Sequence, residues 1–283
     1  MGSASKTWFI TGCASGFGRA LAAAALARGD KVAVTDRDRG AVAEWQERYP
    51  DTALALQLDV TRHDEIKAAC AAACERFGRI DVLVNNAGYG LQAAVEEVTW
   101  EQIRRLFDVN LYGMIEMIRT LLPQLRRQGG GHIINISSVG GRVTAPLLGI
   151  YGASKFAVEG LTLGLAQEVA GQGIKVTAVE PGAFFTRFGS SAVLAEQQLE
   201  PYAAIREQMT GMIGGLAQGD PETLAEALLE LADADDPPVQ FIGGGDAYGM
   251  IEQELQRQAA EMQAWRPLSE RANSRARVRT AEG

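Results

Sequence analysis

The sequence predicts a doubly wound α/β fold, in which helices cover both faces of a parallel sheet of about seven strands. Short apolar runs rich in β-branched residues alternate along the chain with longer helical stretches, and such alternation is typical of βαβ units. The short runs are almost continuously apolar, as expected for strands that are buried on both faces. Several of them end in polar or glycine-containing segments, which suit a ligand.

Seven runs are predicted to be strands. In chain order they are Thr7–Thr11, Lys31–Thr35, Ala53–Leu58, Val82–Val84, His132–Ile136, Lys175–Val179 and Val239–Ile242. The helices expected among them are Phe17–Arg28, Ala41–Tyr49, Asp64–Phe77, Trp100–Arg127, Phe156–Ala170 and Glu222–Leu231. No internal repeat or low-complexity linker interrupts this pattern, so residues 1–265 are expected to form a single domain.

Two segments depart from the alternation. Residues 184–219 follow the sixth strand and carry many large apolar side chains, and we interpret them as an insertion over the sheet edge that acts as a substrate lid. The second segment is the C-terminus. There Ala247–Trp265 is expected to be a late helix, and residues 266–283 an arginine-rich tail outside the domain.

Composition excludes several classes of function. The chain has 283 residues, a net charge of −8 and a pI near 5.0, which argues against a nucleic-acid partner. No apolar run approaches the ~20 residues of a membrane span, and no signal-peptide pattern is seen, so the expected location is the cytoplasm. With three cysteines, two histidines and no cluster of ligand residues, no metal site is expected.

Ser138, Tyr151 and Lys155 form a trio that can move a proton at neutral pH. Tyr151 and Lys155 stand four residues apart, and Ser138 lies thirteen residues before the tyrosine. A free tyrosine titrates near pH ~10, but a lysine one helical turn away lies on the same face and is expected to lower the pKa of the phenol. The phenol can then exchange a proton with an alcohol or carbonyl oxygen that the serine holds. The alternative is an ordinary helix start.

The segment Thr11–Gly18 is a glycine-rich turn between the first strand and the first helix. Gly12, Gly16 and Gly18 allow the backbone to turn tightly and to approach a pyrophosphate, and the helix N-terminus favours anions. The spacing is GxxxGxG, which differs from the GxGxxG of other dinucleotide-binding turns. A tight turn that merely needs glycine is the alternative.

Asp36 follows the second strand, eighteen residues after Gly18. An acid at this place can accept hydrogen bonds from the ribose hydroxyls of NAD, and it would repel the extra phosphate of NADP. Arg37 follows and could pair with that phosphate. We therefore expect NAD as the cofactor and keep NADP as the alternative, beside a simple solvated acid in a charged turn.

Four other strands end in segments suited to a ligand. These segments are Asp59-Val60, Asn85–Gly88, Ser137-Ser138 and Pro181-Gly182. Because open α/β sheets bind ligands at the carboxyl ends of their strands, these segments are expected to meet at one edge.

Together these motifs resemble the short-chain dehydrogenase/reductase family, in its compact single-domain branch. The similarity extends from about Lys6 to Phe241 and includes the TGxxxGxG turn, the NNAG at Asn85–Gly88 and the PGxxxT that ends at Thr186. The resemblance implies a Rossmann-type sheet of seven parallel strands. It also implies a homodimer or homotetramer, assembled through the helices that match Trp100–Arg127 and Phe156–Ala170.

The resemblance also implies a role for each matching residue. Tyr151 would be the general acid/base, Lys155 would lower its pKa and bind the nicotinamide ribose, Ser138 would orient the substrate oxygen, and Asn110 would support a water-linked proton path to Lys155. The implied cofactor-binding residues are Gly12, Ser15, Gly16, Phe17, Gly18, Asp36, Arg37, Asp59, Val60, Asn86, Ala87, Gly88, Tyr151, Lys155, Pro181, Gly182 and Thr186.

Within that set the implied contacts differ. Asp59 and Val60 would flank the adenine, Asn86 would lie near the adenine ribose, and Thr186 would reach the nicotinamide amide or the phosphates. Three segments, Thr11–Gly18, Val179–Phe184 and Gly244–Ala247, are also similar to a bacterial subgroup related to retinol and 17β-hydroxysteroid dehydrogenases. Members of that subgroup often have a neutral residue where this chain has Asp36, followed by arginine, and they use NADP.

The resulting hypothesis is the reversible oxidation of a secondary alcohol to a ketone with a nicotinamide cofactor. Apolar side chains in the insertion indicate a hydrophobic substrate, for example a steroid-like one; the alternative is that they pack the lid onto the body. These side chains are Phe184, Phe185, Phe188, Met209, Met212 and Ile213. The alternatives are a polyol or sugar substrate, and a dinucleotide-binding redox sensor without turnover.

Overall fold

Seven parallel strands form one sheet in a computed structural model that describes residues 5–186, 192–214 and 218–272. The strand order is β3-β2-β1-β4-β6-β7-β9. The strands are β1 (Thr7–Thr11), β2 (Lys31–Asp36), β3 (Ala53–Gln57), β4 (Val82–Asn85), β6 (Gly131–Ile136), β7 (Ile174–Pro181) and β9 (Gln240–Gly243). All seven predicted strands are present, and the predicted fold class is confirmed.

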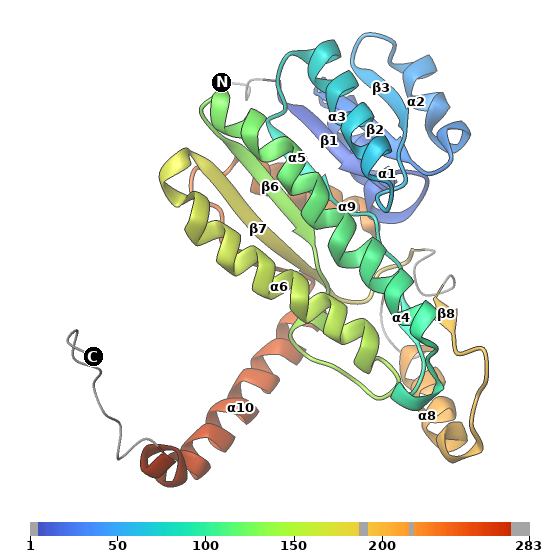
Figure 1. The fold of residues 1–283 in the computed structure, drawn as a ribbon, viewed down its shortest axis with the longest axis vertical. Helices are drawn as coiled ribbons and strands as arrows, with labels where there is room; N and C mark the ends of the chain where they lie inside the picture. The colour runs from blue at the N-terminus through green and yellow to red at the C-terminus, as the bar shows by residue number, and fades with distance from the viewer. Residues whose placement is uncertain (1–4, 187–191, 215–217, 273–283) are drawn as a thin grey trace, which may run out of the picture.

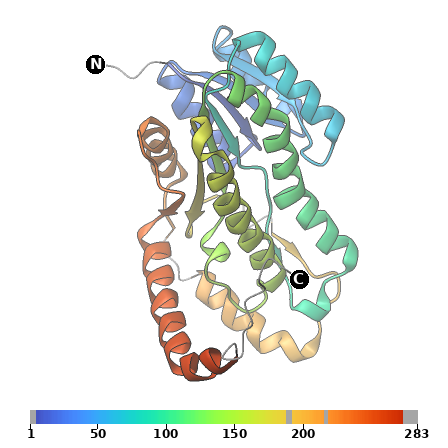
Figure 2. The ribbon, with the colours of Figure 1, turned by 60° about the vertical axis from the view of Figure 1, so that its left-hand side comes forward.

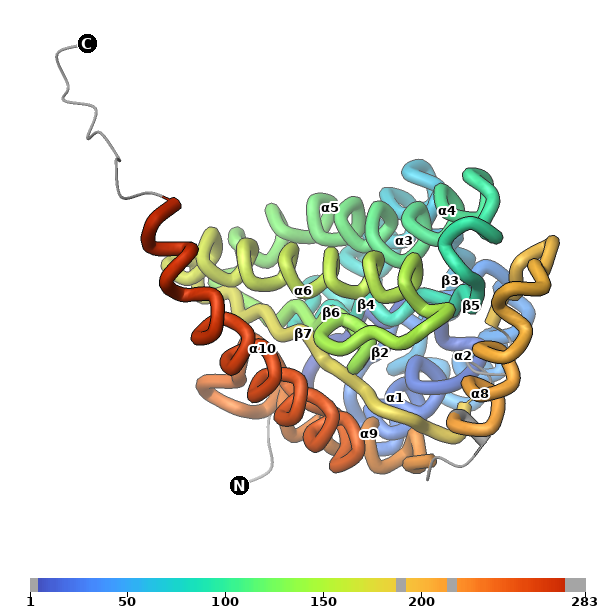
Figure 3. The backbone as a smooth tube through the Cα atoms, turned by 90° about the horizontal axis from the view of Figure 1, so that it is seen from below, coloured from blue at the N-terminus to red at the C-terminus, as the bar shows by residue number. Residues whose placement is uncertain are grey.

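Helices cover both faces of the sheet, as Figure 3 shows. One core packs α1 and α9 against the sheet, and the other packs α3, α5 and α6. The helices are α1 (Gly16–Ala27), α2 (Ala43–Arg48), α3 (His63–Phe77), α4 (Trp100–Phe107), α5 (Gly113–Arg127), α6 (Gly149–Val169), α8 (Ala203–Gly214), α9 (Pro221–Asp233) and α10 (Gly245–Ala272). Figure 1 shows α5 and α6 side by side on the same face.

The strand order creates a switch point in the middle of the sheet. From β1 the chain moves outward through β2 to β3, and it then returns to place β4 on the other side of β1. Crossover segments that leave β1 and β4 therefore diverge to opposite sides. A crevice opens between such segments at the carboxyl ends of the strands, and this crevice positions the site described below.

Two predicted helices differ in detail from the structure. The stretch Trp100–Arg127 is helical throughout, but a π-helical turn at Asp108–Tyr112 separates α4 from α5. Helix α6 begins at Gly149, seven residues before the predicted start. Glycine is a poor helix former, which hides this first turn in the sequence. Gly152 is needed there because a Cβ would lie 2.8 Å from Thr144 Oγ1.

Helix α10 is longer than predicted. It continues past Trp265 and through Pro267 to Ala272, so the predicted tail of residues 266–283 is helical in its first part, and residues 273–283 lie outside the described residues. An ion pair from Arg266 Nε to Glu270 Oε1 at 2.7 Å spans the turn that contains the proline. Figure 1 shows α10 projecting from the body, and its dark red end changes direction. The single domain of residues 1–265 stays a prediction.

The predicted insertion is tied to the body at several points. Strand β8 (Val193–Leu194) pairs with β5 (Leu91–Gln92) in a separate two-stranded sheet. The buried Glu97 carboxylate accepts the N–H of Leu199 at 2.7 Å and Nη1 of Arg206 at 2.6 Å. Burial acts to raise the pKa of Glu97, but these donors outweigh it and the pKa is lowered. Figures 1 and 2 place α8 at the opposite end of the molecule from α3.

None of the helices in the described ranges combines the length and the apolar character that crossing a bilayer requires.

Candidate active site

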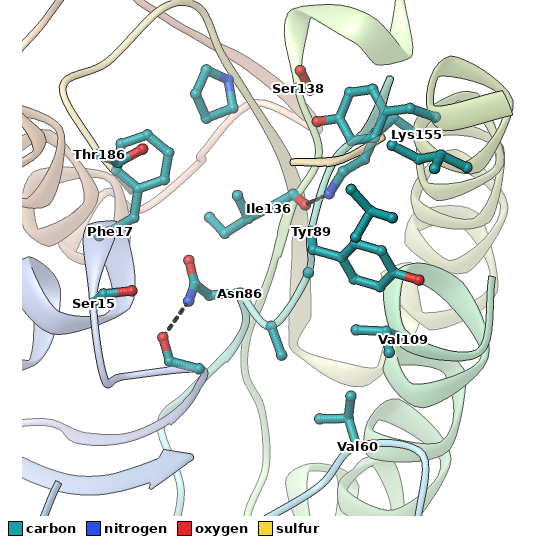
Figure 4. A pocket seen from close by; sticks show the side chains of 18 of the residues that line it. Ser15, Phe17, Val60, Asn86, Tyr89, Val109, Ile136, Ser138, Lys155 and Thr186 are labelled. Atoms are coloured by element: carbon teal, nitrogen blue, oxygen red, sulfur yellow. Dashed lines mark hydrogen bonds between the residues drawn. The ribbon is translucent and has the colours of Figure 1, made fainter. Parts of the chain in front are cut away.

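A cavity of about 930 Å³ lies at the carboxyl ends of the strands. Its walls come from the segments that follow β1, β2, β3, β4, β6 and β7. Every predicted cofactor-binding residue except Gly18 lines it, and so do three of the four predicted catalytic residues, all but Asn110. Figure 4 shows Ser15 and Thr186 on one side of this cavity and Lys155 on the other.

The glycine-rich turn between β1 and α1 has a backbone that needs glycine. Gly12 and Gly16 have φ angles of +73° and +58°, in the left-handed region that other residues rarely adopt. Gly18 is needed for a different reason, because a Cβ there would lie 2.4 Å from Gly12 O and 2.5 Å from Asn86 Nδ2. Gly18 therefore supports the turn from behind instead of lining the cavity.

Asn86 and Thr11 fasten the end of β4 to this turn. Asn86 Nδ2 donates to Thr11 O at 2.8 Å and to Gly12 O at 3.0 Å. In return, Thr11 Oγ1 accepts the N–H groups of Asn86 and Ala87, both at 3.0 Å. Thr11 is not among the predicted site residues, although it opens the TGxxxGxG motif that could have signalled it.

Asp36 ends β2 at the cavity wall. Its Oδ2 accepts the N–H of Ala14, in the glycine-rich turn, at 3.0 Å. The neighbouring Arg37 is exposed and lines the same cavity. Asp36, which favours NAD, and Arg37, which could pair with the phosphate of NADP, therefore both border the site.

The segment after β3 forms the adjacent wall. Asp59 Oδ1 accepts the N–H and the hydroxyl of Thr61 at 2.9 Å and 2.8 Å, which holds the turn in one conformation. Val60 packs so closely on the start of α5 that a Cβ on Gly113 would lie 2.6 Å from Val60 O. This wall is therefore rigidly positioned by α5.

Tyr151 and Ser138 meet inside the cavity. Tyr151 is 7% exposed, and its hydroxyl is hydrogen-bonded to the Ser138 side chain. The sequence analysis predicts a lowered phenol pKa, and this prediction is wrong. Burial raises the pKa of Tyr151 to about 12, although the bond to Ser138 acts in the opposite direction, because burial penalises the phenolate more than the serine favours it. The phenol is therefore protonated near neutral pH.

Lys155 lies one helical turn after Tyr151 on α6, as predicted, and is buried. Its Nζ donates to the Ile136 carbonyl at 2.9 Å, a bond that Figure 4 shows. Burial lowers the pKa of Lys155 to about 8, while the charge of Glu159 acts to raise it. The ammonium form therefore prevails at neutral pH and is lost as the pH rises through about 8.

Asn110 is fully buried in the π-helical turn and does not line the cavity. Its side chain pairs with the backbone of Tyr89, accepting at 3.1 Å and donating at 3.0 Å, and it also donates to Ser154 Oγ at 3.3 Å. Between Asn110 and the lysine lies Gly88, where a Cβ would be 3.2 Å from Asn110 Oδ1 and 3.7 Å from Lys155 Nζ. Extra π-turns often occur at functional sites.

The loop after β7 closes the other side of the cavity. Asp246, at the start of α10, accepts the N–H of Ala183 at 2.7 Å. Gly182 is required beneath it, because a Cβ there would clash with the Asp246 carboxylate at 2.2 Å. Phe184 packs edge-on against Phe17 with ring centroids 5.1 Å apart. The end of α10 that touches the body therefore positions this loop.

Comparison with known proteins gives a consistent result. The family model described as short chain dehydrogenase matches residues 6–197. A short-chain dehydrogenase from Streptomyces avermitilis superposes with a TM-score of 0.89 at 40% identity, covering 95% of this chain and 99% of its own. The curated relative Oxidoreductase BOA17 of Botryotinia fuckeliana is 36% identical over 93% of this chain and 98% of its own length.

This chain belongs to the short-chain dehydrogenase family. The resemblance read from its motifs is thereby confirmed, and the protein is an oxidoreductase of that family. A second similar structure is a 3-ketoacyl-(acyl-carrier-protein) reductase from Brucella melitensis complexed with NADH. It has 31% identity and a TM-score of 0.74, and the match covers 86% of this chain and 98% of that one.

The residues of this short-chain dehydrogenase fit a nicotinamide dinucleotide. Gly12 and Gly16 keep side chains out of the way of a diphosphate, and the N-terminus of α1 lies at the same place. Ser15, the N-cap residue, makes no capping hydrogen bond with its side chain, which suits a helix end that receives an anion. Asp36 stands where an acid can accept from ribose hydroxyls.

Several residues of the site were missed by sequence reasoning. Apolar and aromatic side chains that line the cavity from outside the motifs are Leu58, Tyr89, Leu91, Val109, Ile136, Val193 and Leu194. Leu58, Tyr89 and Ile136 directly adjoin predicted segments and could have been included with them. Leu91, Val193 and Leu194 come together only because β5 pairs with the distant β8, so no local pattern reveals these three. Within the described residues, no group of three or more His, Cys, Asp and Glu side chains is placed to hold a metal ion.

The apolar residues predicted to form the lid lie in different surroundings. Phe184 lines the cavity. Met209 is buried against Ala94 and Leu147, so it packs the insertion onto the body. Phe185 and Met212 are 77% and 51% exposed and lie outside the cavity lining. Phe188 lies outside the described residues, and nothing is described of the side chain of Ile213.

Proposed function

We propose that this protein interconverts a ketone and a secondary alcohol, with a nicotinamide dinucleotide as the hydride carrier and Tyr151 as the proton carrier. The observation that supports this reaction is the arrangement of Ser138, Tyr151 and Lys155 on one wall of a cavity whose opposite wall is a glycine-rich turn. When bound, the dinucleotide supplies the hydride chemistry, and the protein supplies position and proton transfer.

Tyr151 acts in this proposal on the substrate oxygen. The phenol is protonated near neutral pH because burial raises its pKa, so it donates its proton to a ketone oxygen as that oxygen gains negative charge. Ser138 is bonded to the phenol and anchored by the N–H of Gly140 at 3.0 Å. Its hydroxyl can hold the same substrate oxygen beside the phenol. The protonated phenol is the form that acts in ketone reduction.

Lys155 places a positive charge within one helical turn of the phenol. Its ammonium group can bind ribose hydroxyls and stabilise the phenolate that remains after proton donation. Gly88 leaves the space between Lys155 and Asn110 open to a small polar group. This arrangement supports the implied water-linked proton path, in which Asn110 acts as a positioning residue.

NAD is the proposed cofactor. The Asp36 carboxylate is fixed at the cavity wall by the N–H of Ala14, where it can accept from ribose hydroxyls and repel a 2′-phosphate. The similar Brucella reductase is complexed with NADH. Arg37 is the observation that favours the alternative, NADP.

A hydrophobic ketone is the proposed substrate. Support comes from the apolar side chains of Leu91, Val193 and Leu194 along the cavity, together with Phe184. A pocket with apolar walls and few convergent polar groups selects substrates of the same character. A polyol or sugar would leave those walls unmatched, and a redox sensor without turnover would have no use for a buried phenol bonded to a serine.

Assembly into a homodimer or homotetramer is also proposed. Helices α5 and α6 lie side by side. On α6 Phe156 and Leu163 are 45% and 41% exposed, and Tyr112 at the end of the π-turn is 56% exposed. Large apolar side chains gathered on one face are typical of interaction surfaces.

The first test concerns the acid. Tyr151→Phe removes the proton donor but keeps the ring, so kcat for ketone reduction is expected to fall by about 10²–10⁴-fold while the dissociation constant for NADH, measured by fluorescence, changes little. Tyr248→Phe, on the exposed part of α10, is the matched control and should retain full activity. Near-parental turnover of the Tyr151→Phe enzyme would contradict the proposed mechanism.

The second test concerns the cofactor. We expect kcat/KM to be higher with NADH than with NADPH, and Asp36→Ser to lower that preference by about tenfold or more, since one unit charge near a surface is worth a few kcal/mol. Asp38→Ser, in the same exposed turn, is the control. A wild-type enzyme that prefers NADPH would show the assignment to be wrong.

The third test concerns the substrate. In a panel of ketones and sugars at saturating cofactor, we expect turnover of aliphatic or aromatic ketones. Leu194→Asn is expected to raise KM for them about tenfold with little change in kcat. Met212→Asn, exposed on α8 away from the cavity, should have no such effect. Turnover confined to sugars and polyols would refute the proposal.

The fourth test concerns assembly. Light scattering is expected to give a mass of two or four times 30.3 kDa, and Leu163→Lys is expected to reduce it because a buried lysine is costly. Met262→Lys, exposed on α10, serves as a control that keeps the mass. A monomeric wild-type protein would disprove the expected assembly.

A further inference from the structure

A small apolar core lies apart from the two cores that flank the sheet. Its buried members are Ala94, Leu147 and Met209, which come from the stretch after β5, the turn before α6, and α8. Leu147 has a φ angle of +64°, which is uncommon for a residue with a bulky side chain. Backbone strain of this kind persists only where the surrounding packing imposes it, so this core holds its three segments together.

Glu97 places a buried charge beside this core. Its side chain is 0% exposed, and both carboxylate oxygens have donors. Oε1 accepts the N–H of Leu199 at 2.7 Å and Nη1 of Arg206 at 2.6 Å, and Oε2 accepts the N–H of Ala94 at 2.9 Å. Because these donors come from the insertion as well as from the body, the carboxylate joins the two.

Arg206, on α8, completes a closed set of bonds. While its Nη1 reaches Glu97, its Nη2 donates to the carbonyl oxygen of Leu199, whose N–H is bound by the same carboxylate. Both polar backbone groups of Leu199 are therefore held. This use of two guanidinium nitrogens needs the planar fork of arginine, which lysine lacks. We call Glu97, Arg206 and the backbone of Leu199 the Glu97 clamp.

Strand β8 depends on the Glu97 clamp for its position. Val193 and Leu194 are 39% and 51% exposed, so burial does little to hold them, and a pair of very short strands has little stability of its own. Leu199 lies five residues after the end of β8. Its bonds to Glu97 and Arg206 therefore limit where the strand can lie.

The Glu97 clamp acts at a distance from the reaction. Glu97, Leu199 and Arg206 do not line the cavity, whereas Val193 and Leu194 do. Any effect of the clamp on the reaction must therefore pass through β8. The glycine-rich turn and the phenol belong to other segments of the cavity wall, so loss of the clamp should alter the apolar wall and leave the rest of the site in place.

We propose that Glu97 and Arg206 are positioning residues that determine a preference for large hydrophobic ketones, because they fix the apolar wall that β5 and β8 form. With the Glu97 clamp intact, the wall has one position, and a long apolar substrate gains contact along it. Without the clamp that contact is lost, whereas a small ketone held at the phenol is little affected. This inference rests on the proposed function in one respect, namely that the substrate is a ketone bound against this wall.

Kinetics with 2-butanone and 2-decanone at saturating NADH test the preference. Arg206→Gln removes both guanidinium bonds, so KM for 2-decanone is expected to rise about tenfold. Its kcat, the KM for 2-butanone and the dissociation constant for NADH should stay within about twofold of the wild-type values. Arg206→Lys keeps the charge near Glu97 but loses the fork, and it should give an intermediate KM for 2-decanone.

The matched control is Arg19→Gln, which breaks an exposed ion pair with Glu44 at 2.7 Å and should leave all these constants unchanged. A general structural role for Arg206 would lower kcat and weaken NADH binding together, or raise KM for both ketones equally. Either result would overturn the proposal, and so would an unchanged KM for 2-decanone in Arg206→Gln.

Hydrogen exchange followed by mass spectrometry tests the Glu97 clamp without any ligand. In Arg206→Gln, amide exchange is expected to be about tenfold faster or more in the peptide from Val193 to Leu199, and unchanged in peptides from β1 and β4. Arg19→Gln should exchange like the wild-type protein throughout. Wild-type exchange of this peptide in Arg206→Gln would show the clamp to be wrong. A wild-type protein that reduces neither ketone would contradict the proposed function, and the exchange result would still decide whether the clamp holds β8.

Discussion

The site depends on the close contact between β1 and β4 at their carboxyl ends. There the Asn86 amide binds two carbonyl groups of the glycine-rich turn, and the Thr11 hydroxyl receives two N–H groups in return. Gly18 lies so close to this contact that no side chain fits. Because hydrogen bonds of this kind are costly to leave unmade once buried, the turn has one conformation available, and the crevice at the switch point opens beside it.

Burial decides the chemistry on the opposite wall. Helix α6 brings Tyr151 and Lys155 to the cavity within one turn, and burial moves both groups toward their uncharged forms, which raises the pKa of the phenol and lowers that of the ammonium. The phenol is thus ready to donate, whereas the lysine needs a nearby anion to keep its charge. A carboxylate one turn further along the helix has the position to meet this need.

Residues far from the reaction hold the remaining walls in place. Glu97 fastens the insertion through Arg206 and Leu199, and Asp246 fastens the loop after β7 through Ala183. Both are acids that accept backbone N–H groups from segments more than sixty residues away. The apolar part of the cavity therefore depends on long-range contacts that have no signature in the local sequence.

The fold class, the seven strands, the membership of the short-chain dehydrogenase family and about half of the cavity lining could be predicted, because hydrophobic periodicity, turn chemistry and motif spacing are local properties of a chain. The first turn of α6 could not be predicted, since Gly152 is there to accommodate Thr144 and not to favour a helix. The late end of α10 beyond Pro267 was missed because the proline argued for an earlier stop. The sequence by itself determined which residues meet at the sheet edge. Only the tertiary structure decided their protonation, from the raised pKa of Tyr151 to the lowered pKa of Lys155, because desolvation arises only when the chain packs.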